Sequence, residues 1–325
     1  MRYENFLHWS VFIAGTIVLI GMLMTGLGVS IGQVSSVAVN YGASSLAAAR
    51  FRPVNLIWFT RLIHSLESLS VFFIITFFGI VASYMAAQVS EGWRDHQLLS
   101  VDRNMGFNWR SYWNFTMSHD IYRLALDLGY TSINILPVFL IIALNIFNKR
   151  SVAAHFILTY ALSLGITVII FLFFPAKSAA VEILGMSTPN LPRAGTEHIP
   201  IIEALRNGEM TNVALERSSG LIDFPSFHAS CAVMFAWFAW RLPGIRWVYL
   251  VLCGLMYLAT PIQGGHYFID VLAGTVIAFL CIKGVPLIIS RINVADVHAV
   301  ESTIQSGLVS GGLTAAASAP RSARG

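Results

Sequence analysis

The chain has 325 residues, of which 56% are hydrophobic and 11% are charged, whereas an average soluble domain has about 25% charged residues. A soluble fold with so few charges could not cover its own surface. The composition therefore excludes a cytosolic enzyme, a secreted disulfide scaffold and a disordered regulator, and it predicts a polytopic membrane protein. The net charge of +4 comes without a run of like charges, which argues against a nucleic-acid partner.

Apolar runs long enough to cross a ~30 Å hydrocarbon core as helices recur along the chain. We predict seven transmembrane spans, over residues 10–32, 69–89, 128–147, 156–174, 225–241, 247–263 and 267–289. The expected fold class is an all-α polytopic membrane bundle. It divides into an N-terminal transmembrane helix with a cytoplasmic linker (1–66), a six-helix membrane domain (67–290) and a disordered cytoplasmic tail (291–325), whose last residues are mostly Ser, Ala and Gly.

Lysine and arginine in the short loops predict the orientation of these spans, because such loops stay in the cytoplasm. The residues concerned are Arg50, Arg52, Arg61, Lys149, Arg150, Arg241, Arg246, Lys283 and Arg291. Seven spans then place the N-terminus outside and the C-terminus in the cytoplasm. Two longer segments face outside, 90–123 and 175–224. Within the first, segment 92–120 is rich in Trp and Arg and is expected at the membrane interface, and the second is expected to hold a short helix at about 201–207.

Most cysteines and histidines show no pattern of a metal or catalytic site. Cys231, Cys253 and Cys281 lie in apolar stretches without a CxxC pair, so we expect buried free thiols. Seven histidines are interpreted as structural or solvated: His8, His64, His96, His119, His155, His198 and His298.

Two polar clusters interrupt the apolar chain, one at the start of the fifth predicted span and one at the start of the seventh. The first reads Phe224-Pro225-Ser226-Phe227-His228, and the second reads Gly264-Gly265-His266-Tyr267-Phe268-Ile269-Asp270. Only the sixth span separates them, so both lie on the same side of the membrane. We therefore expect His228 and His266 to face one another at similar depth.

The residue types in these clusters suit phosphoryl chemistry. His266 and Asp270 are four residues apart, a spacing that places them on one helix face. A carboxylate there can hold one imidazole nitrogen and leave the other as a nucleophile or base. Ser226, after Pro225, begins a helix whose free N–H groups can bind an anion. His228 could then donate a proton to a leaving oxygen.

Pro225-Ser226-x-His228 and His266-x-x-x-Asp270 resemble the second and third signature motifs of the type 2 phosphatidic acid phosphatase superfamily. That superfamily shares a six-helix core with bacterial acid phosphatases and vanadium haloperoxidases. The longer strings FPSFHAS and GGHYFIDVLAG look more like its inositol-phosphorylceramide synthase branch, the inositolphosphotransferases. The resemblance covers about residues 69–290 and leaves the first span as an addition to the core.

The resemblance implies a role for each matching residue. His266 would be the nucleophile that becomes phosphorylated, and Asp270 would orient it. His228 would protonate the leaving group. Ser226 and the N–H of Phe227 would bind phosphate oxygens.

The cationic part of the family pattern departs from the expected form. The usual first motif contains a Lys followed by an Arg-Pro pair, but here Lys177 is followed by no Arg-Pro. Thr260 stands six residues before His266, where the phosphatases have an arginine. Because those guanidinium groups hold phosphate bidentately, Lys177, Arg206 and Arg217 are candidates to replace them.

The expected function is an integral-membrane phosphotransferase that forms a phosphohistidine and passes a phospho-headgroup to an alcohol or lipid acceptor, as an inositolphosphotransferase does. Its substrate would be a membrane phospholipid, and we expect neither a cofactor nor a metal, since no carboxylate cluster offers a metal site. A lipid phosphate phosphatase that uses water remains open, as does a transporter or non-catalytic membrane protein. The expected location is a bacterial inner membrane, with the active site facing the periplasm.

Overall fold

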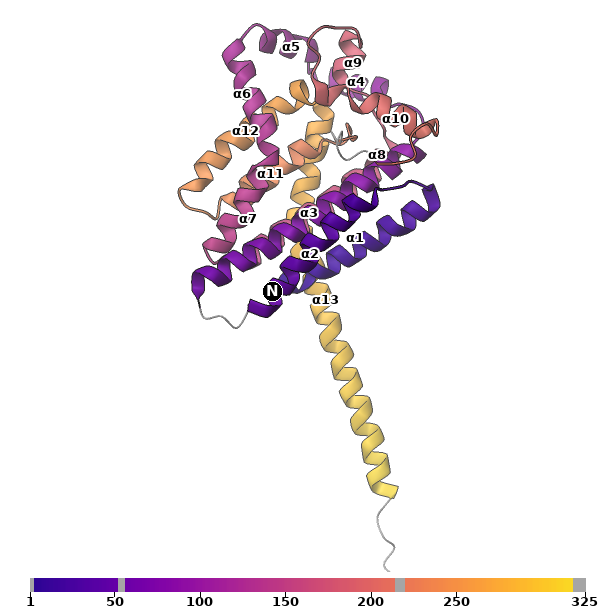
Figure 1. The fold of residues 1–325 in the computed structure, drawn as a ribbon, viewed down its shortest axis with the longest axis vertical. Helices are drawn as coiled ribbons and strands as arrows, with labels where there is room; N and C mark the ends of the chain where they lie inside the picture. The colour runs from indigo at the N-terminus through magenta and orange to yellow at the C-terminus, as the bar shows by residue number, and fades with distance from the viewer. Residues whose placement is uncertain (1–2, 52–55, 214–219, 318–325) are drawn as a thin grey trace, which may run out of the picture.

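The computed structural model describes residues 3–51, 56–213 and 220–317, and within them β-structure is limited to an isolated bridge between Gly28 and Asn212. The first helices are α1 (Glu4–Thr25), α2 (Ile31–Phe51), α3 (Ile57–Val89), α4 (Asp95–Asn104), α5 (Trp109–Met117), α6 (Asp120–Thr131), the 3₁₀ turn η1 (Ser132–Asn134) and α7 (Leu136–Ile146). They are followed by α8 (Arg150–Phe173), α9 (Ala179–Leu184), the 3₁₀ turn η2 (Arg193–Gly195), α10 (His198–Arg206), α11 (Phe227–Ala239), α12 (Ile245–Gln263) and α13 (Phe268–Ala317) (Figure 1).

Five helices of the described part are long and apolar enough to cross a membrane: α1, α3, α8, α12 and the first half of α13. A sixth span can form from α6 with η1 and α7, which are bent by 56°. Pro137 lies in the first turn of α7, where a missing backbone N–H is tolerated. Proline cannot continue a helix that precedes it, so the chain bends between α6 and α7. The fifth predicted span, 225–241, corresponds to α11, which has only 13 residues.

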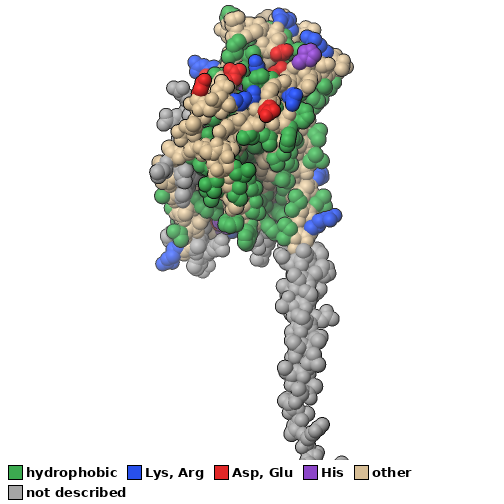
Figure 2. All heavy atoms as spheres, turned by 90° about the vertical axis from the view of Figure 1, so that its right-hand side faces the viewer, with side chains coloured by type: hydrophobic (Ala, Val, Ile, Leu, Met, Phe, Trp, Pro, Cys, Tyr) green, Lys and Arg blue, Asp and Glu red, His purple; other side chains and the backbone are tan. Residues whose placement is uncertain are grey.

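The helices are apolar on the outside of the bundle as well as on the inside. Phe156 and Phe235 are fully buried, whereas Leu280 and Leu287 on α13 are more than 60% exposed. In Figure 2 the exposed apolar side chains form a band below the end where the acidic side chains gather. Helices that are apolar all round are typical of membrane spans. The chain is therefore an all-α, multi-pass integral membrane protein, as its composition predicted.

The N-terminal region differs from the prediction. Residues 33–66, expected to be a linker, contain most of α2, and both α1 and α2 pack against α3. The ring of Tyr3, just before α1, stacks on His155 near the start of α8, with ring centroids 4.8 Å apart. Past the other end of α1, Gly28 pairs with Asn212. The N-terminus thus lies at the opposite end of the bundle from the histidine motifs (Figure 1). The prediction that both lie on the same side of the membrane is wrong, because α2 adds a helix that runs back along the bundle between α1 and α3.

The segments expected to cover one end of the bundle do so. α4, α5, α9 and α10 lie together beyond the ends of the long helices (Figure 1), and α10 corresponds to the short helix predicted at 201–207. The three cysteines are free and buried, as predicted. The predicted disordered tail differs, since α13 continues as a helix to Ala317.

Candidate active site

Each histidine motif lies at a capped helix start. The Ser226 hydroxyl accepts a hydrogen bond from the N–H of Ala229 at 3.4 Å and so caps α11. The carboxylate of Asp102, on α4, accepts from the N–H groups of Phe268 (2.7 Å) and Ile269 (2.9 Å) and caps α13. These bonds satisfy N–H groups that have no partner within the helix, so both starts are held in place.

The two helix starts contact each other directly. The N–H of Ser226 donates to the carbonyl oxygen of Asp270 at 3.1 Å, and the Ser230 hydroxyl donates to the carbonyl oxygen of Gly274 at 2.6 Å. A Cβ at position 274 would stand 2.1 Å from the carbonyl oxygen of Ser226. Glycine at 274 therefore permits the close approach that brings the motifs together.

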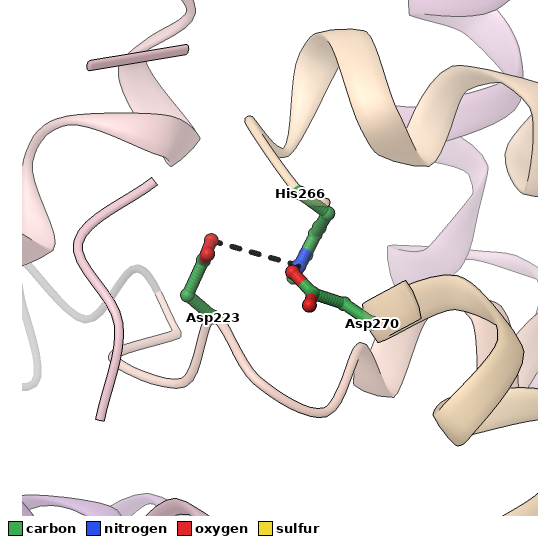
Figure 3. A group of neighbouring side chains, drawn as sticks. All are labelled: Asp223, His266 and Asp270. Atoms are coloured by element: carbon green, nitrogen blue, oxygen red, sulfur yellow. Dashed lines mark ion pairs between the residues drawn. The ribbon is translucent and has the colours of Figure 1, made fainter. Parts of the chain in front are cut away.

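His266 lies in the loop between α12 and α13, just before the helix that its spacing to Asp270 suggested. Its Nδ1 is 3.4 Å from Oδ2 of Asp270 and 3.5 Å from Oδ1 of Asp223. Figure 3 shows the imidazole held between these two carboxylates. All three side chains are buried. The sequence predicted the contact with Asp270 and missed the one with Asp223.

The other side of the imidazole lies close to a glycine. A Cβ at Gly264 would stand 2.9 Å from Nε2 of His266 and 2.4 Å from its Cδ2. The absence of a side chain at position 264 lets the imidazole pack against the backbone there. Both Gly264 and His266 line the cavity described next, and Nδ1 lies near the two carboxylates, which leaves Nε2 as the nitrogen for a substrate.

A cavity of about 510 Å³ joins the histidines to the middle of the bundle. Its titratable lining includes His198, Asp223, His228 and His266. The rest of its wall is mainly apolar and comes from α3, α7 and α8, with Phe72, Phe73, Gly79, Ile80, Pro137, Tyr160 and Leu164 among the lining residues. Phe73 is 53% exposed, so this wall includes a side chain on the outer surface of the bundle.

His228 shares the cavity with His266, as the spacing of the motifs suggested. Its ring stacks on that of Tyr130, with centroids 4.1 Å apart and planes 8° from parallel. This contact fixes the plane of the imidazole. Phe227 also lines the cavity, whereas Ser226 does not and its hydroxyl acts as the helix cap.

Of the predicted phosphate-binding cations that the structure describes, Lys177 and Arg206, neither lines the cavity. Lys177 and Arg206 both lie over the ring of Trp93, with Nζ 5.4 Å and the guanidinium carbon 4.2 Å from its centroid. Arg206 also donates to the hydroxyl of Ser90 at 2.8 Å. Arg217 lies outside the described residues.

A family model described as the PAP2 superfamily matches residues 96–283, more than half of the chain. The chain belongs to this superfamily. The match includes both histidine motifs, the helices α5 to α12 and the first part of α13, but not α3, which forms part of the cavity wall. No curated protein and no solved structure gives a significant match. Membership in the PAP2 superfamily supports a lipid phosphoesterase of the phosphatase or phosphotransferase type, while the inositol-phosphorylceramide synthase branch stays a prediction.

Burial favours the neutral forms of His266 and Asp223. Removal from water lowers the pKa of His266 to about 3, and the nearby His228 contributes to this shift. Burial raises the pKa of Asp223 well above its usual range, and the negative charges of Asp270 and Asp95 add to the effect. A neutral imidazole is the form that can act as a nucleophile.

Two further carboxylates that the sequence analysis missed hold the third motif in place. Asp95 accepts from the N–H groups of Lys177 and Ser178, at 3.0 and 3.1 Å, and from the hydroxyl of Tyr267 at 2.9 Å. Asp102 caps α13. The two aspartates are seven residues apart, about two helical turns, and this repeat in segment 92–120 was the available signal.

His198, interpreted as structural or solvated, is buried and lines the cavity. Its Nε2 lies 2.5 Å from the carbonyl oxygen of Lys177, and its Nδ1 lies 3.2 Å from that of Ala194. Both ring nitrogens therefore face backbone carbonyls. Burial lowers the pKa of His198. These contacts support the structural interpretation.

The group formed by Asp223, His266 and Asp270 has the composition of a metal site. Each residue offers one ligand atom, and these atoms all lie within 4.8 Å of one another. The sequence analysis expected no metal, because it found no carboxylate cluster. Asp223, which it did not place near His266, completes this group in the structure.

Proposed function

We propose that this protein is a membrane phosphotransferase that moves a phospho-headgroup from a phospholipid to an alcohol acceptor through a phosphohistidine at His266. The observation that carries the proposal is that His228 and His266 line one cavity together with many apolar side chains. A lipid has the matching form, with a phosphate at one end and apolar chains at the other. Ligand cavities of this kind combine apolar walls with a few polar groups that orient the substrate.

In the first step, Nε2 of neutral His266 attacks the lipid phosphorus. The bond from phosphorus to the lipid oxygen breaks, and His228, as an imidazolium, donates a proton to that oxygen. A neutral lipid such as diacylglycerol leaves, and the phospho-headgroup stays bonded to His266. The carboxylate of Asp270 at Nδ1 stabilises the positive charge that develops on the ring.

In the second step, the hydroxyl of the acceptor attacks the same phosphorus and transfers its proton to His228. The bond between phosphorus and Nε2 breaks, which restores both histidines. Free N–H groups at the start of α11 bind the phosphate oxygens in both steps. Attack by water instead of an alcohol would release the free phospho-headgroup, or inorganic phosphate when the substrate is a lipid monophosphate, and would make the protein a hydrolase.

The cover over the site supports transfer rather than hydrolysis. α4, α5, α9 and α10 lie over the end of the bundle that carries the motifs (Figure 1). A covered site can position an alcohol and exclude competing water. The resemblance of FPSFHAS and GGHYFIDVLAG to inositolphosphotransferases points to a polyol headgroup.

We also propose that the site faces the periplasm from a bacterial inner membrane. Lys149 and Arg241 lie in the two connections at the end of the bundle opposite the histidine motifs, and Arg150 and Arg246 lie in the first turns of the helices α8 and α12 that follow them. Short loops with such residues stay in the cytoplasm.

The test is to give the purified chain, in lipid vesicles, phospholipid labelled in the headgroup phosphate, with and without inositol, glycerol or a ceramide-like alcohol. The expected result is label on the acceptor in excess of free phospho-headgroup, with release of the neutral lipid and acid-labile label on the protein. H266N should lose all three signals, and H96N, at an exposed position, should keep them.

The other outcomes separate the alternatives. Inorganic phosphate or free phospho-headgroup as the only labelled product, with every acceptor, would exclude a transferase and support the phosphatase. Absence of any product and of vanadate binding would exclude both, and would leave a transporter or a non-catalytic protein.

A further inference from the structure

The ring of His228 is held differently from the rings of the other two cavity histidines. His266 lies near two carboxylates, and both ring nitrogens of His198 face backbone carbonyls. His228 is partly buried and lines the cavity. Among the described residues, no hydrogen bond or ion pair of its imidazole accompanies the contact with Tyr130. A ring stack, and not a polar group, therefore orients His228.

The contact with Tyr130 is a nearly parallel stack, with ring centroids 4.1 Å apart and planes at 8°. Tyr130 lines the same cavity. A stack fixes the plane of the imidazole and occupies neither of its nitrogens. The face of an aromatic ring also attracts a cation within ~6 Å, so the contact is attractive when the imidazole carries a second proton as well as when it is neutral.

The path of α6 brings Tyr130 to this place. Tyr130 lies in the last turn of α6, directly after Gly129. A Cβ at position 129 would stand 2.6 Å from the carbonyl carbon of Leu255 and 2.7 Å from the backbone nitrogen of Met256. Glycine there lets α6 lie against the backbone of α12. The chain then bends by 56° towards α7, so α6 ends beside the cavity.

We propose that Tyr130 is a positioning residue for His228, whose imidazole it holds by stacking while both ring nitrogens stay available to the reactants. This inference rests on the proposed function. There, one nitrogen of His228 gives a proton to the leaving lipid oxygen and then takes a proton from the acceptor hydroxyl. A carbonyl or carboxylate bonded to the ring would compete with these two oxygens for an imidazole nitrogen. An aromatic face holds the ring without that competition.

The test compares two phosphoinositol esters that differ in their need for a proton. Release of diacylglycerol from phosphatidylinositol requires protonation of the leaving oxygen, whereas nitrophenol leaves as a stable anion. The first turnover is measured, because the acceptor attacks only afterwards. General acid catalysis contributes ~10²–10⁴-fold where a proton is needed. Y130L should therefore release diacylglycerol ~10²-fold more slowly and nitrophenol at nearly the unaltered rate, and Y130F, which keeps the aromatic face, should resemble the unaltered chain with both esters.

The matched control is Y122L, which makes the same change on the same helix. Tyr122 contacts Tyr112, and neither residue lines the cavity, so Y122L should release both leaving groups at the unaltered rate. Circular dichroism and gel filtration show whether each variant folds. Y130M provides a second variant without an aromatic ring.

Nuclear magnetic resonance of isotope-labelled histidine rings tests the contact without any reaction, with H228N to assign the signal of His228. The face of Tyr130 should displace this signal, and the displacement should persist in Y130F and vanish in Y130L. An unchanged signal in folded Y130L and Y130M would overturn the proposal.

The rates provide independent grounds for rejection. The proposal would fail if Y130L released diacylglycerol at the unaltered rate, if it slowed both esters equally, or if Y130F lost as much as Y130L. Release of neither leaving group by the unaltered chain would instead reject the proposed function. The resonance of His228 would then decide by itself whether Tyr130 positions the ring.

Discussion

The two sides of the His266 ring have opposite surroundings. Carboxylate oxygens of Asp223 and Asp270 lie 3.5 and 3.4 Å from Nδ1, whereas the Nε2 side of the ring meets the backbone of Gly264, where no side chain intervenes. An imidazole that is held at one nitrogen and accessible at the other has the arrangement required of a nucleophile. The reactivity of this residue therefore depends as much on a glycine as on its charged neighbours.

Replacing Gly264 by alanine should remove that access. The new Cβ would stand 2.4 Å from Cδ2 of His266 and 2.8 Å from the carbonyl oxygen of Thr260, so the ring must move. A displacement of about 1 Å at a reacting group costs ~10²-fold in rate, and we expect a fall in kcat of that size in the phosphotransfer assay. G254A, on the helix α12 that Gly264 follows and with nothing within 4 Å of its Cβ, is the matched control. Equal rates for the two variants would contradict the role of Nε2.

The short helix α11 depends on its neighbours for position. With 13 residues it extends only about 20 Å at 1.5 Å per residue, and it begins within the bundle at the level of the cavity. Its start is fixed by contacts with α13 at Ser226, Ser230 and Gly274. This shortness lets a helix N-terminus and His228 lie beside a lipid-sized cavity.

Replacing Gly274 by alanine should separate α11 from α13. The added Cβ meets backbone rather than a flexible side chain, 2.1 Å from the carbonyl oxygen of Ser226. Overpacking of this kind costs about 1–3 kcal/mol, so thermal unfolding should occur at a lower temperature and transferase activity should fall. G284A, also on α13 but with open space at its Cβ, should be neutral or stabilised by up to ~1 kcal/mol. Equal Tm values for the two variants would show that the contact is not restrictive.

The two ends of the molecule carry different structural features. One end has the covering helices and the histidine motifs, and the other has the N-terminus, the start of α8 and the loop between α11 and α12 (Figure 1). The outer surface between them is apolar (Figure 2). A membrane around this band would place the cavity where a lipid can reach it from the bilayer.

Cysteine labelling tests the orientation in the membrane. The three native cysteines are buried, so new ones report selectively. A membrane-impermeant reagent applied outside intact cells should label S187C, at the covered end, and should not label P243C, in the loop at the opposite end; both positions are exposed. The N-terminus should behave like P243C. Labelling of P243C alone would place the site in the cytoplasm.

Local patterns in the sequence determined the fold class and the centre of the site. Long apolar runs identified the spans α1, α3, α8, α12 and α13, because a membrane requires such runs of any helix that crosses it. Proline followed by serine predicted the start of α11. The pairing of His266 with Asp270 followed from four-residue spacing. Each of these features is set by residues that are near one another in the chain.

Only the tertiary structure determined which residues that are distant in the chain contact these helices and the site. Asp223 is 43 positions before His266, and nothing in their separation predicts that both reach one nitrogen. Asp102 caps a helix that starts far along the chain, and Lys177 and Arg206 lie over Trp93 instead of in the cavity. α2, with a weaker apolar signal, was placed in a linker and packs on α3. These contacts could not be predicted from the sequence alone, because each depends on how the helices pack. Helix packing brings together side chains that are far apart in the chain and that no regular sequence spacing relates.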